Sequence, residues 1–490
     1  MSNTFSGTSY NKNGWKYISV WGEPFERGLA YGYYSAPEFI KIKEMLTYNT
    51  FESTGRQWSF FINIAKKHFT PKIRRHFPEL YEELQGIADG CVKYGVDTDI
   101  DEIIAWNNYI TIVDCWYPVW MRKQNAKSGI SENVSTSKEG GSKDRCSAFI
   151  ANGKYTQDGK IVVAHNSFVD FIDGQYYRVI LDIKPTNGHR ILMQTSACNI
   201  WSGTDFFVTS AGIIGTETTI GGFISYKENL PISCRIRKAM QYGTHLDDYV
   251  TILLDGNSGD YANAWLFGNI HTNEIMRFEL GLKYWDVQRT MDGYYYGCNF
   301  AFSPEIRNFE CVNTGYCDIR RHQGARQVRI PMLIDKYKGK INTKIAQNII
   351  SDHYDVYLHK NNPCSRTVCA HYELDAREYM SDPGRPKPYT PKGAIDGIVA
   401  DATMIKNMSF LAKYGSSCNS SFYSDKFCKQ HPQWNHLQPY LFDRPSQPWT
   451  LFNVYKESST NKHRFHSKRI SSSRALHHST RKANKVKSNT

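Results

Sequence analysis

The sequence predicts an α+β fold in layers, with helices and strands gathered in separate stretches of the chain. Apolar residues recur at helical spacing through much of the first 121 residues. From residue 146 the apolar runs become short and are separated by Asn-Gly, Asp-Gly and Ser-Gly turns, a pattern typical of antiparallel strands. Helices then strands, repeated once, favour layers over alternating βαβ units.

The N-terminal segment, residues 1–121, is expected to be mainly helical. Residues 15–21 alternate as a strand does, and Pro24 then marks the first turn of a helix whose glycines allow close packing. Residues 78–94 and 101–115 carry helical periodicity. No run approaches the roughly 20 apolar residues that a membrane span requires.

A polar linker is expected at residues 122–145, where Ser, Lys, Gly, Asn and Glu replace the apolar residues. Behind it, the runs 147–152 and 161–166 predict a hairpin that begins at Cys146. Cleavage of the Arg145–Cys146 bond would therefore free an α-amino group beside a thiol, without disturbing a core. Such an amine, with a pKa of about 7.7 to 8.0, can take and return the proton of the attacking sulfur. The alternative is a buried structural cysteine.

The remaining residues up to 455 are expected to form the main domain. Further strands are predicted at 177–183, 190–195, 206–210, 212–216, 264–267 and 275–280, and helices at 249–254, 325–337 and 343–351. Thr244 and Asp247 have the spacing of a capping box ahead of the first of these helices.

The positive charge is concentrated at the C-terminal end. Residues 456–490 contain ten Lys and Arg against one acid, so this tail carries +9 of the formal net charge of +13. With few apolar residues, the tail is expected to be disordered. It is either a contact for nucleic acid or another acidic surface, or a solvated extension.

The compartment follows from the first residues and the cysteines. Residues 1–14 contain no apolar segment of a secretory signal, which predicts a cytoplasmic protein. The twelve cysteines are then expected to be thiols. In an oxidising compartment, Cys364 with Cys369 and Cys418 with Cys428 are candidate small-loop disulfides.

Several motifs lie in the order found in one known family. They are Cys-Ser-Ala-Phe at 146–149, Val-Ala-His-Asn at 163–166, Ser-Gly-Thr-Asp-Phe at 202–206, Glu-Thr-Thr-Ile-Gly at 217–221, Asn-Ser-Gly-Asp-Tyr-Ala-Asn-Ala-Trp at 257–265 and Gly-Ala-Ile-Asp at 393–396. From about residue 15 to 451 the chain resembles the phospholipase B-like (lamina ancestor-like) proteins. These N-terminal-nucleophile (Ntn) hydrolases are distantly related to acyl-coenzyme A:6-aminopenicillanate acyltransferase and bile-salt hydrolase. The resemblance implies a four-layer αββα sandwich and a precursor that cuts itself ahead of Cys146.

The resemblance also assigns site residues. They are the nucleophile Cys146, His165, Thr218 or its neighbour Thr219, Asn299 and Arg320, with Arg321 and Arg326 competing for the last position. A cationic side chain near the thiol favours the thiolate, and the resemblance gives this place to His165. Thr218 is expected to help hold the oxyanion, and Asn299 to be its amide donor. Phe168 departs from the tryptophan or aspartate usual in the family.

The leading hypothesis is a hydrolase of ester or amide bonds in acylated small molecules or lipids, acting in lipid degradation without a metal ion or cofactor. The resemblance implies a lysosomal or secreted location, in contrast to the missing signal segment. One alternative is a relative that folds but no longer turns over substrate. Another is a zinc-stabilised binding module with a nucleic-acid-binding tail, and its candidate ligands are Cys311, Cys317, His322, Cys364, Cys369 and His371. A papain-like protease pairing Cys146 with His353 or His371 lacks the expected Cys-Gly-x-Cys-Trp context.

Overall fold

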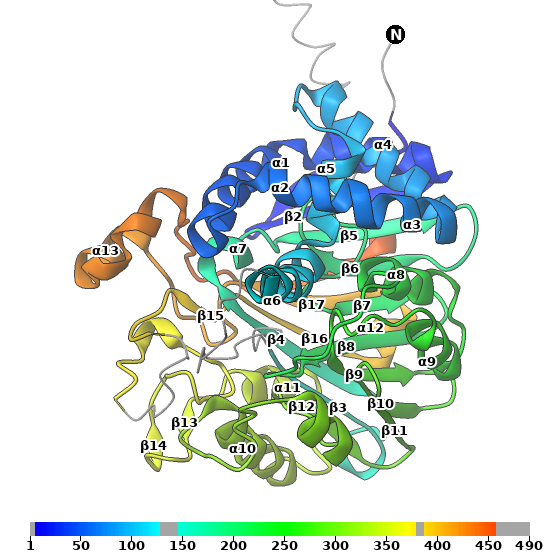
Figure 1. Cartoon of the computed structure of the whole chain (residues 1–490). Coiled ribbons are helices and arrows are strands. Elements are labelled where there is room, and N and C mark those ends of the chain that lie inside the picture. Colours follow the sequence, from blue (N-terminus) through cyan, green and yellow to red (C-terminus); the bar gives the residue numbers. More distant parts are fainter. Residues whose placement is uncertain (1–4, 128–145, 379–386, 457–490) are drawn as a thin grey trace, which may run out of the picture.

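Two large β-sheets form the centre of the molecule (Figure 1). The computed structural model describes residues 5–127, 146–378 and 387–456. Within them the chain has a mixed α+β structure, as predicted. Most of the expected linker, residues 128–145 with Arg145, and the basic tail from residue 457 onward lie outside the described residues.

The larger sheet has nine strands. Their order is β1 (Gly7–Lys12), β2 (Trp15–Gly22), β5 (Val179–Pro185), β6 (Ile191–Thr195), β7 (Phe206–Thr209), β8 (Ile213–Thr219), β9 (Asn263–Asn269), β10 (Glu274–Leu280) and β11 (Trp285–Thr290). Neighbours pair antiparallel except β2 and β5, which are parallel. Strands from the N-terminal segment therefore belong to the same sheet as strands that follow Cys146.

The smaller sheet has seven strands and contains Cys146. Its order is β12 (Tyr294–Gly297), β3 (Cys146–Ala151), β4 (Val162–Asp170), β16 (Asp396–Asp401), β17 (Ser409–Tyr414) and β18 (Thr450–Asn453), and β15 (Lys392–Ala394) also pairs with β4. A separate two-stranded ribbon joins β13 (Tyr354–Asp355) and β14 (Lys360–Asn361).

The helices cover the outer faces of the two sheets (Figure 1). They are α1 (Pro24–Thr54), α2 (Trp58–Ile64), α3 (Thr70–His76), α4 (Pro78–Tyr94), α5 (Ile100–Asn107), α6 (Tyr117–Lys127), α7 (Phe171–Gly174), α8 (Ile232–Tyr242), α9 (Leu246–Leu254), α10 (His322–Lys336), α11 (Thr343–Ile350), α12 (Ala402–Lys406) and α13 (Ser424–Gln430). Glycines bring α1 and α4 together as expected: a Cβ at Gly28 would lie 2.1 Å from the carbonyl oxygen of Glu83.

Side-chain alternation along β3 separates two cores. Ala148 and Ile150 pack between the sheets, against Ile180, Leu192 and Ile214 of the larger sheet. Phe149 and Ala151 point the other way and pack against α10 and α11. The opposite face of the larger sheet packs against α1, α4, α8 and α9. Any residue of β3 with the parity of Ala148 therefore faces the layer between the sheets.

Some local predictions were wrong. Residues 122–127 continue α6 instead of beginning the linker. The capping box ahead of α9 is formed by His245 and Asp248, one position after the predicted pair Thr244 and Asp247. Among the described helices, none is both long enough and apolar enough to cross a membrane.

Candidate active site

Cys146 is the first residue of β3 and faces the layer between the two sheets. It shares the parity of Ala148 and Ile150, which belong to the inter-sheet core. Its exposed fraction is 2%. Ser167 of β4 lies directly opposite it in the register of the smaller sheet. The side chain of Cys146 is therefore enclosed, at the end of a strand.

Polar side chains from both sheets surround this end of the layer. We call this group the polar end; it consists of Cys146, His165, Ser167, Gln194, Thr218 and Asp396, all buried. Within the described part of the chain, several of its atoms have no hydrogen-bond partner: both ring nitrogens of His165, Ser167 Oγ, Gln194 Oε1 and Thr218 Oγ1. Buried polar groups are normally hydrogen-bonded, so these atoms make the polar end a candidate functional site.

The backbone of Cys146 is held by two side chains. Its N–H donates to Oδ1 of Asn299 at 3.2 Å, and its carbonyl oxygen accepts from Nη1 of Arg326 at 2.5 Å. Nη2 of Arg326 also donates to Oδ1 of Asn299 at 2.9 Å, which fixes that oxygen toward Cys146. Nδ2 of Asn299 donates to the carbonyl oxygen of Thr219 at 2.8 Å. Asn299 thus acts here as an acceptor for the nucleophile's nitrogen.

Arg326 uses all five of its N–H donors in the interior. Besides Cys146 and Asn299, it donates to the carbonyl oxygens of His322 and Cys298 and to Ser147 Oγ. All five acceptors belong to neutral groups, so none of these partners neutralises the positive charge of the guanidinium beside the start of β3. The ring of Phe168 lies 5.0 Å from its central carbon.

His165 is neutral in this setting. Burial lowers the pKa of its imidazole to about 3, although the backbone of Glu217 opposes that shift. His165 pairs with Ala148, so it is a diagonal neighbour of Cys146 on the same face, at a typical separation of about 7 to 8 Å. A cationic side chain, Arg326, lies beside the start of β3 and binds the carbonyl oxygen of Cys146.

Asp396 joins the two sheets beside Cys146. One carboxylate oxygen accepts from the backbone N–H of Ser167 at 2.7 Å, and the other from Nε2 of Gln194 in the larger sheet at 2.8 Å. Burial raises the pKa of Asp396 to about 6, against the effect of these hydrogen bonds. Only the Gly-Ala-Ile-Asp motif pointed to Asp396 in the sequence, and the motif did not indicate its role.

Thr218 and Thr219 point to opposite faces of β8. Thr218 faces the smaller sheet, where its Oγ1 lies so close to Gly297 of β12 that a Cβ there would be 2.2 Å away. Thr219 faces the helical side, where its Oγ1 lies 3.4 Å from the hydroxyl of Tyr261. Of the two predicted threonines, only Thr218 presents its hydroxyl to the polar end.

The structure places Arg320 away from Cys146. Its side chain is 47% exposed and pairs with Asp318 at 2.9 Å. Arg326, a competing alignment in the sequence, lies at the site instead. Helical spacing was a usable signal, because Arg326 shares the buried face of α10 with Ile330 and Leu333, four and seven residues later.

The structure also has a small pocket, and none of its lining residues belongs to the polar end. It lies between α6 and the turns at 223–226 and 259–262, and Val119, Arg122 and Phe223 are among its lining residues. The turns are linked to the site through the backbone, because the N–H of Gly221 donates to the carbonyl oxygen of Asn299 at 3.2 Å.

The alternative readings of the sequence involve a different group of side chains. Cys369 and His371 lie together with His353 and Cys418, while the other candidate zinc ligands, Cys311, Cys317, His322 and Cys364, lie outside this group. His353 and His371, the candidate partners of a papain-like thiol, are thus members of a separate cluster. Neither candidate disulfide, Cys364 with Cys369 or Cys418 with Cys428, is formed.

Comparison with known proteins is limited. No family model matches the chain. Over 269 residues it is 23% identical to an uncharacterized protein of Archaeoglobus fulgidus, an overlap of 52% of this chain and 41% of the archaeal protein. The match thus spans under half of that relative and does not bear on the resemblance to phospholipase B-like proteins.

Proposed function

We propose that Cys146 is the nucleophile of an Ntn hydrolase of the phospholipase B-like type. In this proposal the Arg145–Cys146 bond is cut first, and the enzyme then hydrolyses ester or amide bonds of acylated, lipid-like substrates. The main observation behind this proposal is that two buried side chains hydrogen-bond the backbone of Cys146. Asn299 accepts from its N–H, and Arg326 donates to its carbonyl oxygen. Every buried backbone N–H and carbonyl needs a partner, but the partners are most often other backbone groups, whereas here both are buried polar side chains.

The arrangement of the layers supports the same proposal. Two sheets face each other across an apolar core, with helices packed on both outer faces. This is the order of layers expected of the four-layer αββα sandwich. The first residue of a central strand, at the edge of the inter-sheet layer, is the place that such an enzyme needs for its nucleophile.

The proposed chemistry uses groups of the polar end. After cleavage, the α-amine of Cys146 takes the thiol proton as the sulfur attacks the substrate carbonyl carbon. The intermediate collapses to a thioester as the amine gives this proton to the departing alcohol or amine. Water, deprotonated by the same amine, then releases the acid and restores the thiol. Asn299 Oδ1 orients the amine throughout.

Charge on the intermediate needs donors near the start of β3. The hydroxyl of Thr218 faces this region and has no hydrogen-bond partner within the described residues. Arg326 places a positive charge nearby, held in advance by its neutral partners. A hydroxyl donor and a fixed positive charge that are in place beforehand stabilise developing charge without reorganisation during the reaction. The pocket beside Val119 and Phe223 is the proposed entry for the acyl group.

Intact-mass analysis tests the proposal. Wild-type protein should give fragments of 145 and 345 residues, while Cys146→Ala should remain one chain. Cys146→Ser, which keeps a weaker nucleophile, should be cut more slowly, and Cys317→Ala, at an exposed thiol, should be cut as the wild type is. A wild-type chain that stays whole contradicts the proposal.

Turnover separates an active enzyme from a degenerate relative. The cut protein should hydrolyse model acyl esters or amides, and a thiol-directed acyl analogue should label Cys146 with one equivalent. Cleavage without labelling or turnover would favour the degenerate alternative.

A further inference from the structure

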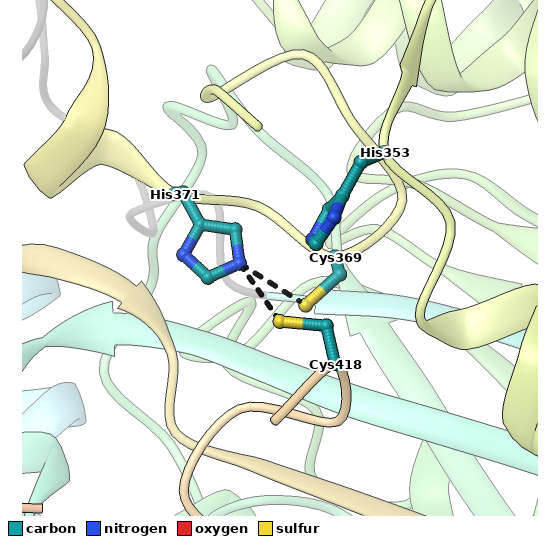
Figure 2. A group of neighbouring side chains, drawn as sticks. All are labelled: His353, Cys369, His371 and Cys418. Carbon is teal, nitrogen blue, oxygen red and sulfur yellow. Dashed lines mark hydrogen bonds between the residues drawn. The ribbon is translucent and has the colours of Figure 1, made fainter. Parts of the chain in front are cut away.

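A second buried cluster lies on the far side of the smaller sheet's central strands. Ligand atoms of His353, Cys369, His371 and Cys418 all lie within 4.8 Å of one another. Figure 2 shows the four side chains pointing toward one shared centre from separate segments. His353 follows α11, Cys369 and His371 precede the short helical turn Tyr372–Leu374, and Cys418 follows β17. We call this group the Cys2His2 cluster.

We propose that the Cys2His2 cluster is a structural zinc site. Two thiolates and two imidazoles are the ligand set of many four-coordinate zinc sites, and they neutralise the charge of Zn²⁺. With all four positions supplied by the protein, such a site is closed to substrate and stabilises the fold. The site is independent of the function proposed for Cys146.

The spacing of the ligands fits a tetrahedral ion. Nε2 of His371 lies 3.4 Å from Sγ of Cys369 and 3.3 Å from Sγ of Cys418. Around a tetrahedral zinc with Zn–S of about 2.3 Å and Zn–N of about 2.0 to 2.1 Å, sulfur and nitrogen ligands are separated by about 3.6 Å. The two observed distances are shorter than this by about 0.2 to 0.3 Å, so small outward shifts of these ligand atoms separate the observed positions from ideal ligation.

The surrounding groups orient the ligands as metal sites require. Nδ1 of His371 lies 2.7 Å from Oε1 of Glu373, which directs the lone pair of Nε2 into the cluster. Nε2 of His353 is buried and, within the described residues, has no hydrogen-bond partner. Ser417 Oγ donates to Sγ of Cys369 at 3.4 Å. A bound metal ion would be the shared partner toward which these ligand atoms are oriented.

The position of the cluster explains what the metal would do. Three ligands come from residues 351–378, where the described strands β13 and β14 are each two residues long, and Cys418 comes from the end of β17. The ion would tie this irregular segment to the sheet. Phe168 of β4 packs in one cluster with Cys369, Tyr372 and Ala394, and its ring contacts Arg326. The metal would thus hold together the irregular segment that packs against Phe168 on the outer side of β4.

Metal analysis of the full chain, purified without a polyhistidine tag, tests the proposal. We expect about one zinc ion per chain. Protein stripped with a chelator and given Co²⁺ alone should show the thiolate-to-cobalt charge-transfer band and the visible d–d bands of tetrahedral cobalt. Absence of both zinc and the cobalt spectrum would overturn the proposal. A mass lower by two hydrogens with a peptide cross-link between Cys369 and Cys418 would also overturn it, in favour of a disulfide.

Variants locate the site. Cys369→Ser and Cys418→Ser should lose the metal, while Cys364→Ser, a buried cysteine of the same segment, and His359→Asn, at an exposed histidine, should keep it. Metal retained by both cysteine variants would overturn the assignment. If those variants do not fold, Glu373→Gln keeps all four ligands and should weaken zinc binding by about 10 to 100-fold. Unchanged affinity there would count against the site.

Thiol reactivity gives a measurement on the unmodified protein. With metal bound, Cys369 and Cys418 should resist alkylation until a chelator is added, whereas the exposed Cys317 should react at once. Alkylation of Cys369 and Cys418 that is indifferent to the chelator would contradict the proposal. The Cys146→Ala variant should retain its metal, so a failure of the hydrolase proposal leaves this result unaffected.

Discussion

The polar end and the Cys2His2 cluster are both buried groups of polar side chains, but different forces hold them in place. Each residue of the polar end that lies on a strand is fixed by the hydrogen-bonded register of its sheet, as Cys146 is by Ser167 and His165 by Ile398. The ligands of the Cys2His2 cluster lie mostly in irregular backbone. The sheets therefore fix the geometry of the first group, while the proposed ion would fix the geometry of the second.

This difference matches two kinds of task. Catalysis benefits from dipoles and charges that are already aimed before the substrate arrives. A structural metal instead contributes its binding free energy to folding. If the comparison is right, each group can be disturbed without disturbing the other.

The largest effect is expected from Arg326→Met, which removes the donors that hold Cys146. Besides the carbonyl of His322, four buried oxygens lose a donor, although Asn299 Oδ1 keeps the N–H of Cys146. Each buried acceptor left unsatisfied costs about 1 to 3 kcal/mol. We expect the free energy of unfolding, measured in urea, to fall by about 5 kcal/mol. The metal content should stay the same.

Arg320→Met is the matched control, six residues earlier. Its exposed ion pair with Asp318 contributes little, so the change should be within about 0.5 kcal/mol. An equal decrease in the free energy of unfolding for the two variants would show that the buried hydrogen bonds of Arg326 contribute no more to stability than the exposed ion pair of Arg320.

Metal removal should have the next largest effect and should act on the other group. A ligand present at about 1,000 times its Kd stabilises the folded state by about 4 kcal/mol, and a chelator removes that amount. We expect a lower Tm and new proteolytic cuts within residues 351–394. The cleavage at Arg145–Cys146 should still occur. Loss of that cleavage on chelation would show that the polar end depends on the metal, in contradiction to the independence of the two groups.

Much of the fold could be predicted because local signals agreed with it. Helix α4 begins and ends at the predicted residues, with Pro78 at its first turn and Gly95 in the left-handed conformation behind it. The strand at Cys146 was predicted from alternation and flanking turns. The extension of α6 was missed because Arg122, Lys123 and Gln124 are polar but are good helix formers.

The sites were harder to predict because they depend on distant pairings. Nothing near Cys369 in the sequence indicates Cys418, since β17 and its pairing with β16 bring that residue into place. Likewise, the choice between Arg320 and Arg326 depends on which face of α10 is buried. Asp396 acquires its role only through Gln194 on the opposite sheet.

His165 makes the polar end sensitive to acid. The unfolded imidazole binds a proton below about pH 6.5, whereas the folded one resists it down to about pH 3, so stability is lost as the pH falls through this window. From pH 7 to pH 4, His165 should lower the free energy of unfolding by about 3 kcal/mol. Urea unfolding of His165→Gln should show a correspondingly smaller loss. The exposed control His359→Gln should behave as the wild type does.

Asp396 should change the free energy of unfolding in the opposite direction to His165 over an overlapping pH range, and by a somewhat smaller amount. Its folded pKa of about 6 lies above the ordinary value of 3.8, so the folded state holds the proton more tightly. Its contribution to stability is present at low pH and is lost as the pH rises through about 6.

The Asp396→Asn variant isolates this term, because the hydrogen bonds that it alters at Ser167 and Gln194 are lost equally at both pH values. From pH 4 to pH 7 the free energy of unfolding of the wild type should therefore change less favourably than that of the variant, by about 2 kcal/mol. Parallel pH profiles for the two proteins would mean that Asp396 is ionised throughout and that the polar end is better solvated than its burial indicates. The effects of His165 and Asp396 on the pH dependence of the free energy of unfolding have opposite signs. The pH profile of the double variant should therefore differ less from the wild-type profile than that of either single variant.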